Sequence, residues 1–276
     1  MNVLINALQA GNRSGTGRYT VELVRALAAL DKGPELSVVW PAAEAVPDFG
    51  SRVTLLRRPA TALRRLIADH WDVLELATRQ GAQVVHYPAN FGPLVTVRNL
   101  VVTVHDLSFV RHPEWFRLDR AVYYRWMLKR STRPAKRFIA DSQATASDLR
   151  DFLRVSEDRI DVVPLGVNPV FQPASAAACA AVRKKYSLPE RFFLYVGTME
   201  PRKNLSRVIA AWGRVAGEHM PDLVIAGRVG WKTGALQATV ERCPRKDHIH
   251  FPGFIPAEDL PALLSSAHAL VWPSLF

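Results

Sequence analysis

A proline, an arginine and a lysine stand together in the segment GTMEPRKNL, residues 197–205. An apolar run, RFFLYV, comes just before it, and a stretch with helical periodicity, SRVIAAW, follows. The pattern predicts that a strand ends near Gly197 and that a helix begins around Pro201, since proline is preset for a first helical turn. Arg202 and Lys203 are therefore expected at the start of that helix.

Two cations at a helix start have an electrostatic cost. A helix N-terminus carries unpaired N–H groups and about half a positive charge, so each added cation costs about 0.3 to 1 kcal/mol. A bound pyrophosphate would offset that cost, because Arg202 can grip oxygens in a fork and Lys203 can supply a movable charge. The alternative is a surface turn whose cations reach into water.

A glycine-rich turn, GNRSGTGRYT at 11–20, follows the first predicted strand and leads into the first predicted helix. Gly11, Gly15 and Gly17 leave room for the backbone to approach a ligand closely. The segment meets neither the dinucleotide GxGxxG pattern nor the Walker pattern, so a Rossmann dehydrogenase or a P-loop NTPase is not indicated. The alternative is a tight connection without a ligand.

A histidine ends an apolar strand in VVTVHDLSF, residues 101–109. Polar groups at buried strand ends reach ligand crevices, and His105 could hydrogen-bond a hydroxyl or orient a leaving group at neutral pH. The alternative is a structural histidine. The sequence offers no recognisable Ser/His/Asp set, HExxH motif or glycosidase carboxylate pair.

Composition narrows the class of protein. The chain has 276 residues, of which 49% are hydrophobic, and its length favours two domains. The two cysteines, Cys179 and Cys243, have no Cys or His at metal-ligand spacing, which fits a reducing cytoplasm and predicts neither a disulfide nor a zinc site. The N-terminus does not resemble a signal peptide, and no apolar run is long enough to span a membrane.

The net charge of +11 is locally dense between 111 and 137, where arginine and lysine alternate with aromatic residues. A segment of this kind could lie on an anionic membrane, where each cation near the surface contributes about 1 kcal/mol. It could also track nucleic acid. The remaining interpretation is a solvated helix face whose aromatic residues pack inward.

Short β-rich runs alternate with helical patterns along the whole chain, which is typical of parallel α/β sheets. Residues 164–175 contain three prolines and no helical period, so they are expected to link two domains. The predicted strands before this linker are 3–8, 36–40, 53–56, 83–87, 100–106, 137–142 and 159–165. After it, strands are predicted at 191–197, 222–227, 248–254 and 269–274.

Four segments together resemble the retaining glycosyltransferases of family 4, the group 1 glycosyltransferases with the GT-B fold. The segments are YVGTMEPRKNLSRVIAAW, HDLSFVRHPEWF, ADSQATASDLRDFL followed by RIDVVPLGV, and HFPGFIPAEDLPALLSSAHALVWPS. The resemblance covers the whole chain. It implies two Rossmann-like α/β domains whose parallel sheets face a cleft, with the acceptor held by 1–172 and the nucleotide-diphospho-sugar by an incomplete domain, 173–276.

The resemblance also assigns roles by position. Arg202 and Lys203 are similar to the pair that binds the donor pyrophosphate and stabilises the departing diphosphate. His105 resembles the family's histidine beside the donor sugar. The other implied donor-binding residues are Gly15, Thr16 and Gly17 in a loop over the phosphates, Gly197 after the strand, and Gly253, Phe254 and Ile255 beside the base. The family uses no metal and no further cofactor.

The implied reaction moves a hexose from a nucleotide-diphospho-sugar to a lipid-linked or glycan acceptor with retention of configuration. HDLSFVRHPEWF is most like members that use GDP-mannose, which favours mannose. We expect a cytoplasmic enzyme at the inner face of the membrane, with peripheral contact through 111–137 and no nucleic-acid partner. The alternative is a non-catalytic nucleotide- or polyanion-binding protein.

The family places a Glu, seven residues, Glu element just after a segment like VWPSLF, and the sequence given ends at Phe276. We therefore expect the natural protein to be longer. We also expect a chain that stops at this point to be weakly active or inactive.

Overall fold

The computed structural model describes residues 1–276 except 12–14, 59–67, 216 and 218–219. The described residues form two compact units. The first comprises Met1–Pro113 and Arg117–Gly166, and the second comprises Glu114–Phe116 and Val167–Phe276. The second unit thus begins before the predicted boundary at 172/173, and it includes a short piece that the sequence assigned to the first domain.

The first unit is built on a sheet of seven described strands, all parallel, in the order β3-β2-β1-β4-β5-β6-β7. The strands are β1 (Asn2–Asn6), β2 (Glu35–Pro41), β3 (Val53–Arg58), β4 (Val84–Tyr87), β5 (Leu100–Val104), β6 (Arg137–Ala140) and β7 (Ile160–Val162). All seven match strands predicted from the sequence. The order reverses between β1 and β4, and crevices at such switch points are where open α/β sheets bind ligands.

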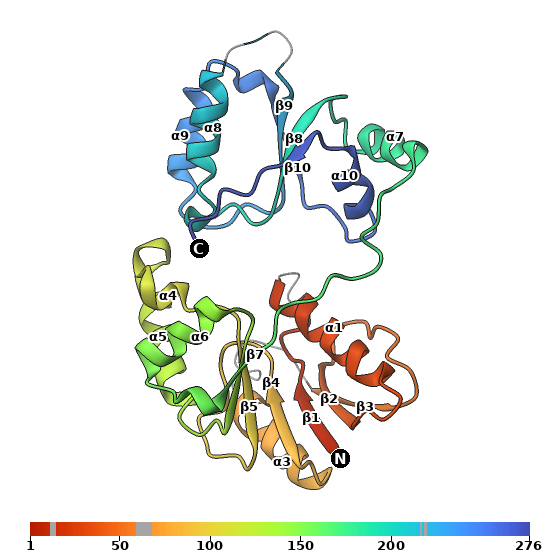
Figure 1. The fold of residues 1–276 in the computed structure, drawn as a ribbon, viewed down its shortest axis with the longest axis vertical. Coiled ribbons are helices and arrows are strands. Elements are labelled where there is room, and N and C mark those ends of the chain that lie inside the picture. The colour runs from red at the N-terminus through yellow and green to blue at the C-terminus, as the bar shows by residue number, and fades with distance from the viewer. Residues whose placement is uncertain (12–14, 59–67, 216, 218–219) are drawn as a thin grey trace. The chain divides into compact units, whose positions relative to one another are not determined.

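Helices cover the faces of this sheet, as buried parallel strands require. The helices of this unit are α1 (Gly15–Ala29), η1 (Ala68–Asp72), α3 (Val73–Arg79), α4 (Ser108–Arg111), α5 (Leu118–Ser131), α6 (Gln143–Leu153) and η3 (Glu157–Arg159). The short turn η2 (Pro113–Trp115) lies between α4 and α5 in the sequence, and its residues Glu114 and Trp115 belong to the second unit. Figure 1 shows α1 along the β1–β3 half and α4, α5 and α6 grouped beyond β5 and β7. Ser142 caps α6 as predicted, accepting a hydrogen bond from the Thr145 backbone N–H at 3.1 Å.

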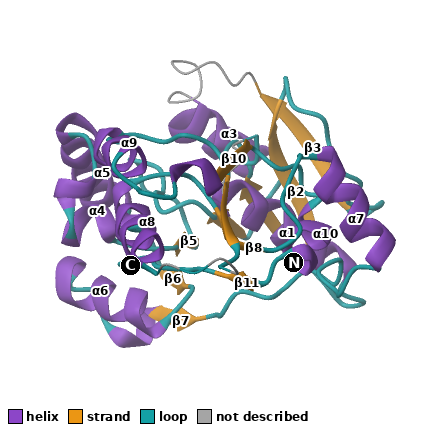
Figure 2. Cartoon of the chain, turned by 90° about the horizontal axis from the view of Figure 1, so that it is seen from above, coloured by secondary structure: helices purple, strands orange, loops and turns teal. Residues whose placement is uncertain are grey.

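The second unit repeats the arrangement with four described parallel strands in the order β10-β9-β8-β11. Its elements are α7 (Ala176–Lys185), β8 (Phe192–Val196), η4 (Pro201–Lys203), α8 (Leu205–Arg214), β9 (Asp222–Ala226), α9 (Gly234–Glu241), η5 (Lys246–His248), β10 (Ile249–Gly253), α10 (Leu260–Ser266) and β11 (Ala269–Leu270). The strand order reverses between β8 and β11. In Figure 2 helices are purple and strands orange.

Both faces of this second sheet are buried. Successive residues of a strand point to opposite faces, so two neighbouring residues of β8 report on the two faces. Leu194 of β8 packs with Val182 of α7 and Leu263 of α10. Its neighbour Tyr195 packs on the other face with Ile209 of α8. The carboxyl ends of β8 and β9 are held between these two helical layers.

Two details differ from the sequence prediction. Pro201–Lys203 form a separate 3-10 turn, and Asn204 adopts a left-handed conformation with φ 57°, so α8 begins only at Leu205. Asparagine tolerates the left-handed conformation better than most residues, so the 3-10 turn can end and α8 can begin as a separate helix at this position. The strand predicted over 269–274 pairs as a strand only over Ala269–Leu270, where both residues are exposed.

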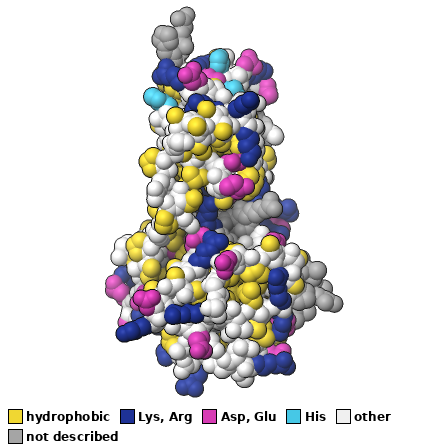
Figure 3. Space-filling model, turned by 90° about the vertical axis from the view of Figure 1, so that its right-hand side faces the viewer, with side chains coloured by type: hydrophobic (Ala, Val, Ile, Leu, Met, Phe, Trp, Pro, Cys, Tyr) yellow, Lys and Arg dark blue, Asp and Glu magenta, His cyan; other side chains and the backbone are white. Residues whose placement is uncertain are grey.

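Lys and Arg side chains are spread over both units on the face drawn in Figure 3, which agrees with a charge that is not confined to a tail. Among the described residues, no helix combines the length and the hydrophobicity needed to cross a bilayer. Within the same residues, no group of three His, Cys, Asp or Glu side chains is placed to hold a metal ion.

Candidate active site

His105 follows β5 directly and is held on both sides by groups that follow the neighbouring strands. Its Nε2 lies 3.0 Å from the backbone oxygen of Pro88, after β4, and its Nδ1 lies 2.6 Å from Oδ2 of Asp141, after β6. A carbonyl oxygen and a carboxylate both accept hydrogen bonds, so each ring nitrogen of His105 faces an acceptor. The side chain is 14% exposed and therefore remains accessible.

The backbone of His105 is also fixed. Its N–H donates to Oδ1 of Asn90 at 2.7 Å, and its carbonyl oxygen accepts from the Thr145 hydroxyl at 2.9 Å. These bonds satisfy the histidine without a ligand, which is what the structural alternative requires. They also hold a polar ring in one place at the carboxyl edge of the sheet, as a ligand site requires.

Tyr19 connects α1 to this histidine. The Tyr19 ring meets the His105 ring edge-on, with centroids 4.8 Å apart. Its hydroxyl lies 3.3 Å from the Thr103 hydroxyl, which in turn lies 2.8 Å from Nε2 of His86. Burial raises the pKa of Tyr19. Burial, aided by repulsion from His105, lowers the pKa of His86 to about 4, so His86 is neutral at pH 7.

The predicted glycine loop leads into α1, which begins at Gly15. A Cβ placed on Gly15 would meet no atom within 4 Å, so packing among the described residues does not require glycine there. The backbone oxygen of Thr16 accepts from the Thr20 hydroxyl, and Gly17 is buried. Residues 12–14 of the predicted loop lie outside the described residues.

In the second unit, the segment after β11 packs on the turn that carries the two predicted cations. Nζ of Lys203 lies 4.9 Å from the centre of the Trp272 ring. The backbone N–H of Leu275 donates to the backbone oxygen of Arg202 at 2.9 Å. Nδ2 of Asn204 donates to the oxygen of Pro273 at 3.2 Å. The turn therefore lies at the switch point between β8 and β11.

Arg202 has an internal partner that the sequence analysis did not foresee. Its Nε donates to the carboxylate of Glu200, whose side chain is only 5% exposed. The turn thus carries two cations and one buried anion, a smaller excess of charge than the prediction assumed. Burial, followed by the negative charge of Glu200, raises the pKa of Tyr195, whose ring stacks on Trp272 at 5.8 Å.

Three glycines line the carboxyl edge of the second sheet: Gly197 after β8, Gly227 after β9 and Gly253 at the end of β10. We call them the glycine edge. All three have positive φ, of 155°, 139° and 79° respectively. A Cβ on Gly227 would lie 1.9 Å from the backbone oxygen of Gly197, so only glycine fits there. The edge presents backbone rather than side chains.

The two residues after Gly253 differ in exposure. Phe254 is 43% exposed, and the guanidinium of Arg228 lies 5.9 Å from the centre of its ring. Ile255 is 4% exposed and packs in the core with Leu263. A ligand at this position could therefore meet the backbone of Ile255 but not its side chain.

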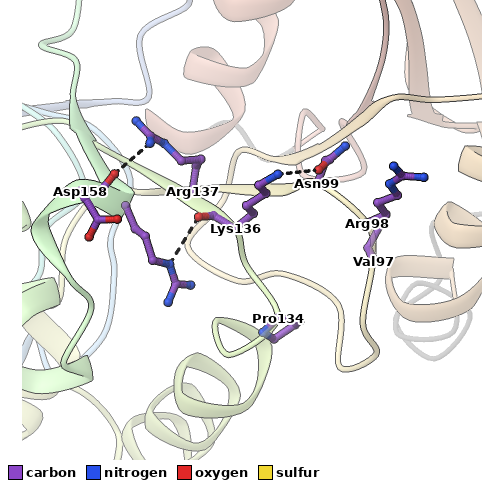
Figure 4. Close-up of a pocket in the computed structure, with 8 residues that line it drawn as sticks. Val97, Arg98, Asn99, Pro134, Lys136, Arg137 and Asp158 are labelled. Carbon is purple, nitrogen blue, oxygen red and sulfur yellow. Dashed lines mark hydrogen bonds between the residues drawn. The ribbon is translucent and has the colours of Figure 1, made fainter.

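A hollow of about 670 Å³ lies at the opposite, amino-terminal edge of the first sheet (Figure 4). It is lined by Val97, Arg98, Asn99, Pro134, Lys136, Arg137, Asp158 and Arg159. Arg137 pairs with Asp161 at 2.6 Å, and Lys136 donates to Asn99 at 3.1 Å. None of the predicted site residues lines this hollow.

The predicted residues are linked to different extents in the two units. In the first unit Tyr19 links the start of α1 to His105, and in the second unit Arg202 and Lys203 follow Gly197 on one loop. The sequence analysis missed the partners Asp141, Tyr19, Glu200, Trp272 and Gly227. Asp141 and Gly227 lie at the carboxyl ends of the predicted strands 137–142 and 222–227, so the rule that singled out His105 would have found them.

The fold agrees with that of solved GT-B glycosyltransferases. The crystal structure of WaaG, a glycosyltransferase involved in lipopolysaccharide biosynthesis, matches all of this chain and 75% of its own, with TM-score 0.71 and 17% identity. Anabaena HepE in complex with UDP-glucose matches 99% of this chain and 74% of its own, with TM-score 0.69 and 16% identity. At these identities the likeness defines the fold class.

Sequence comparison identifies the family. The model of glycosyltransferase family 4 matches residues 13–171, and the model of glycosyl transferases group 1 matches 181–276. The O-antigen chain mannosyltransferase B of Escherichia coli is 30% identical over 95% of this chain and 73% of its own length. The O-antigen chain mannosyltransferase RfbU of Salmonella typhimurium is 28% identical over 65% of this chain and 46% of its own length. The chain belongs to the group 1 glycosyltransferases.

Proposed function

We propose that the chain transfers a mannosyl residue from a nucleotide-diphospho-sugar to a lipid-linked or glycan acceptor, with retention of configuration. Membership of the glycosyltransferase family supports the reaction class. The O-antigen mannosyltransferases among the relatives support mannose and a polysaccharide product. UDP-glucose in the HepE complex supports a nucleotide-sugar as the donor class.

One observation carries the proposal: Arg202 and Lys203 lie on a loop at the switch point of the second sheet, beside the glycine edge. Backbone without side chains allows a diphosphate to approach closely, and the two cations complement its charge. Negative charge grows on the diphosphate as the bond to the sugar breaks. Cations that stabilise this growing charge lower the barrier more than they tighten ground-state binding.

The first unit would supply the polar group next to the sugar. The His105 imidazole is held in place by Asp141 and by the oxygen of Pro88, so it would meet the sugar without reorganising. In this proposal Asp141 is a positioning residue, because it acts through the ring of His105. The start of α1, at Gly15 to Gly17, would lie over the donor phosphates.

The proposed setting is the cytoplasmic side of a membrane, where a lipid-linked acceptor is presented. The chain would meet that surface as a peripheral protein through 111–137, as the sequence analysis expected.

The donor can be tested by thermal unfolding of the full-length protein with GDP-mannose, UDP-glucose and ADP-glucose. A ligand at 100 times its dissociation constant stabilises by about 2.7 kcal/mol. We expect GDP-mannose to raise the midpoint most. Absence of a shift with all three nucleotide-sugars would contradict donor binding.

Retention can be tested separately. If transfer occurs, the anomeric configuration of the product, read by NMR, should equal that of the donor. An inverted product would disprove the stereochemical part and leave the transfer itself in place.

A further inference from the structure

Three residues between two helices of the first unit belong to the second unit. Glu114–Phe116 lie between α4 and α5 in the sequence, and the chain on both sides of them, Met1–Pro113 and Arg117–Gly166, forms the first unit. Connecting segments usually run over the surface of the domain whose elements they join. We call Glu114–Phe116 the crossing segment, and its contacts in the second unit suggest what it does there.

The crossing segment is bonded to the loop that follows β9. The indole N–H of Trp231 donates to the backbone oxygen of Trp115 at 2.8 Å. Nζ of Lys232 donates to the backbone oxygen of Glu114 at 2.6 Å. The rings of Phe116 and Trp231 stack, with centroids 5.9 Å apart. Two bonds to successive carbonyl groups and one ring stack fix both the place and the direction of the segment.

The loop after β9 has an unusual backbone at the point of contact. Lys232 has φ 53°, in the left-handed region that lysine seldom adopts. A residue keeps such a conformation where the surrounding contacts determine it, and conformations of this kind cluster at functional sites. The contact with the crossing segment is therefore examined for a role beyond packing.

The same loop is bonded to the segment that leads into Pro201–Lys203, which we call the cation turn. The backbone N–H of Met199 donates to the oxygen of Arg228 at 2.9 Å, and the N–H of Gly230 donates to the oxygen of Met199 at 3.1 Å. Met199 is buried and directly precedes Glu200, the partner of Arg202. A displacement of the loop would thus be passed on to the cation turn.

The crossing segment also reaches the other side of the cation turn. The Trp115 ring meets the Phe276 ring edge-on, with centroids 6.4 Å apart. The neighbouring Leu275 donates its backbone N–H to the oxygen of Arg202 at 2.9 Å. Two segments contact the cation turn, one after β9 and one after β11, and Glu114–Phe116 contact both.

We propose that Trp115 and Phe116 are positioning residues for the donor diphosphate. By holding the loop after β9 and the segment after β11, they keep Arg202 and Lys203 in one arrangement. Cations that are already in place stabilise developing charge without reorganising. The inference rests on the role given to these cations in the proposed function. The alternative is that the crossing segment only stabilises the second unit.

The ring stack is tested with Phe116→Ala in the full-length protein, with turnover measured as GDP released from GDP-mannose. We expect a loss of about tenfold, because a displacement of about 1 Å at a positioned group can cost about 100-fold. The control is Phe152→Ala, a phenylalanine exposed on α6, which should lose less than about twofold. Phe116→Tyr keeps a ring and should restore most of the turnover. Equal turnover in Phe116→Ala and its control would overturn the proposal.

The route through the cation turn is tested by a double-mutant cycle with Arg202→Ala. If Phe116 acts by placing Arg202, the loss caused by Phe116→Ala should shrink from about tenfold to below about threefold once Arg202 is absent. A purely stabilising segment predicts that the two losses multiply. A tenfold loss in both backgrounds would therefore contradict the positioning role.

Hydrogen exchange of the free protein tests the bracing without donor or transfer. The backbone N–H groups of Met199, Lys203 and Leu275 are all hydrogen-bonded in or beside the cation turn. Their exchange should become about fivefold faster or more in Phe116→Ala and stay unchanged in Phe152→Ala. Unchanged exchange in Phe116→Ala would overturn the proposal. Faster exchange in a protein whose unaltered form neither binds nor turns over a nucleotide-sugar would support the bracing and refute the proposed function.

Discussion

The carboxyl edges of the two sheets have the same strand order around the switch point but differ in how their side chains are used. In the first unit, His105 and Asp141 are bonded to each other, and the neighbouring His86 and Tyr19 are joined through Thr103. In the second unit, the glycine edge carries no side chains, and the cations lie on a short turn beside it.

The difference teaches that the fold supplies a place and the residues after each strand supply the chemistry. A closed polar network suits a group that must keep its position next to a neutral sugar. Bare backbone beside two cations suits a charged, closely held ligand. We therefore expect changes at the second edge to affect donor binding and turnover, and changes at the first edge to affect turnover alone.

The largest effect is expected from the cations. In the full-length protein, Arg202→Ala or Lys203→Ala should lower turnover about 100-fold or more, comparable to losing an oxyanion donor. Steady-state kinetics measures this, with calorimetry for donor affinity. Arg207→Ala, an exposed cation on α8, serves as the control and should change turnover less than twofold. Turnover near normal in both cation variants would defeat the proposed role.

The glycine edge gives the next effect, on stability. Gly227→Ala should lower the free energy of unfolding by about 2 to 3 kcal/mol, because a Cβ there would overlap the Gly197 oxygen in a strained backbone region. Gly15→Ala, where a Cβ meets open space, should leave unfolding within about 0.5 kcal/mol of normal. Chemical denaturation compares the two. Equal effects would mean that the close approach at the glycine edge is absent in solution.

At the first edge, Asp141→Asn should lower turnover about tenfold, because an amide oxygen is a weaker hydrogen-bond acceptor for Nδ1 of His105 than a carboxylate and holds the ring less firmly. Donor affinity should stay within about twofold, since Asp141 lies outside the unit proposed to bind the nucleotide. Asp141→Glu should restore part of the turnover. A fall in donor affinity equal to the fall in turnover would remove the proposed division of labour between the edges.

The smallest effect is a pH dependence of stability from His86. Its pKa is about 4 in the folded chain, below the unfolded value of about 6.5, so the unfolded state binds more protons between these values. Stability should therefore fall as pH drops through this window, by about 1 kcal/mol at pH 5.5. His86→Asn should remove this contribution. If the variant shows the same pH dependence of stability as the unaltered protein, the effect does not come from His86.

Much of the fold could be predicted because both sheets are buried on two faces, which forces apolar runs such as 36–40 and 191–196. Glycines and prolines flank these apolar runs and so mark where each strand ends. The start of α8 could not be placed, because only the left-handed Asn204 separates a 3-10 turn from the helix. The same limit applies to β11, where the sequence stays apolar beyond the two paired residues.

The candidate site residues were chosen one by one from the sequence, without their structural partners. Arg202, Lys203 and His105 are visible because charged or polar groups directly follow apolar strands. The ion pair of Glu200 with Arg202 and the hydrogen bond of Asp141 with His105 depend on side-chain direction and on which strands are neighbours, and a linear sequence states neither. Trp272 meets Lys203 only because β11 lies next to β8.

The glycine edge has a practical consequence for anyone wishing to alter ligand preference by mutagenesis. Amide groups of Gly197 and Gly227 cannot be exchanged by codon substitution, and adding a side chain at Gly227 damages the fold before it reshapes a pocket. Selectivity must then be engineered from the flanks, where the exposed ring of Phe254 offers a replaceable surface. Libraries that vary Gly227 would return mostly misfolded protein, and those centred on Phe254 would return folded variants to screen.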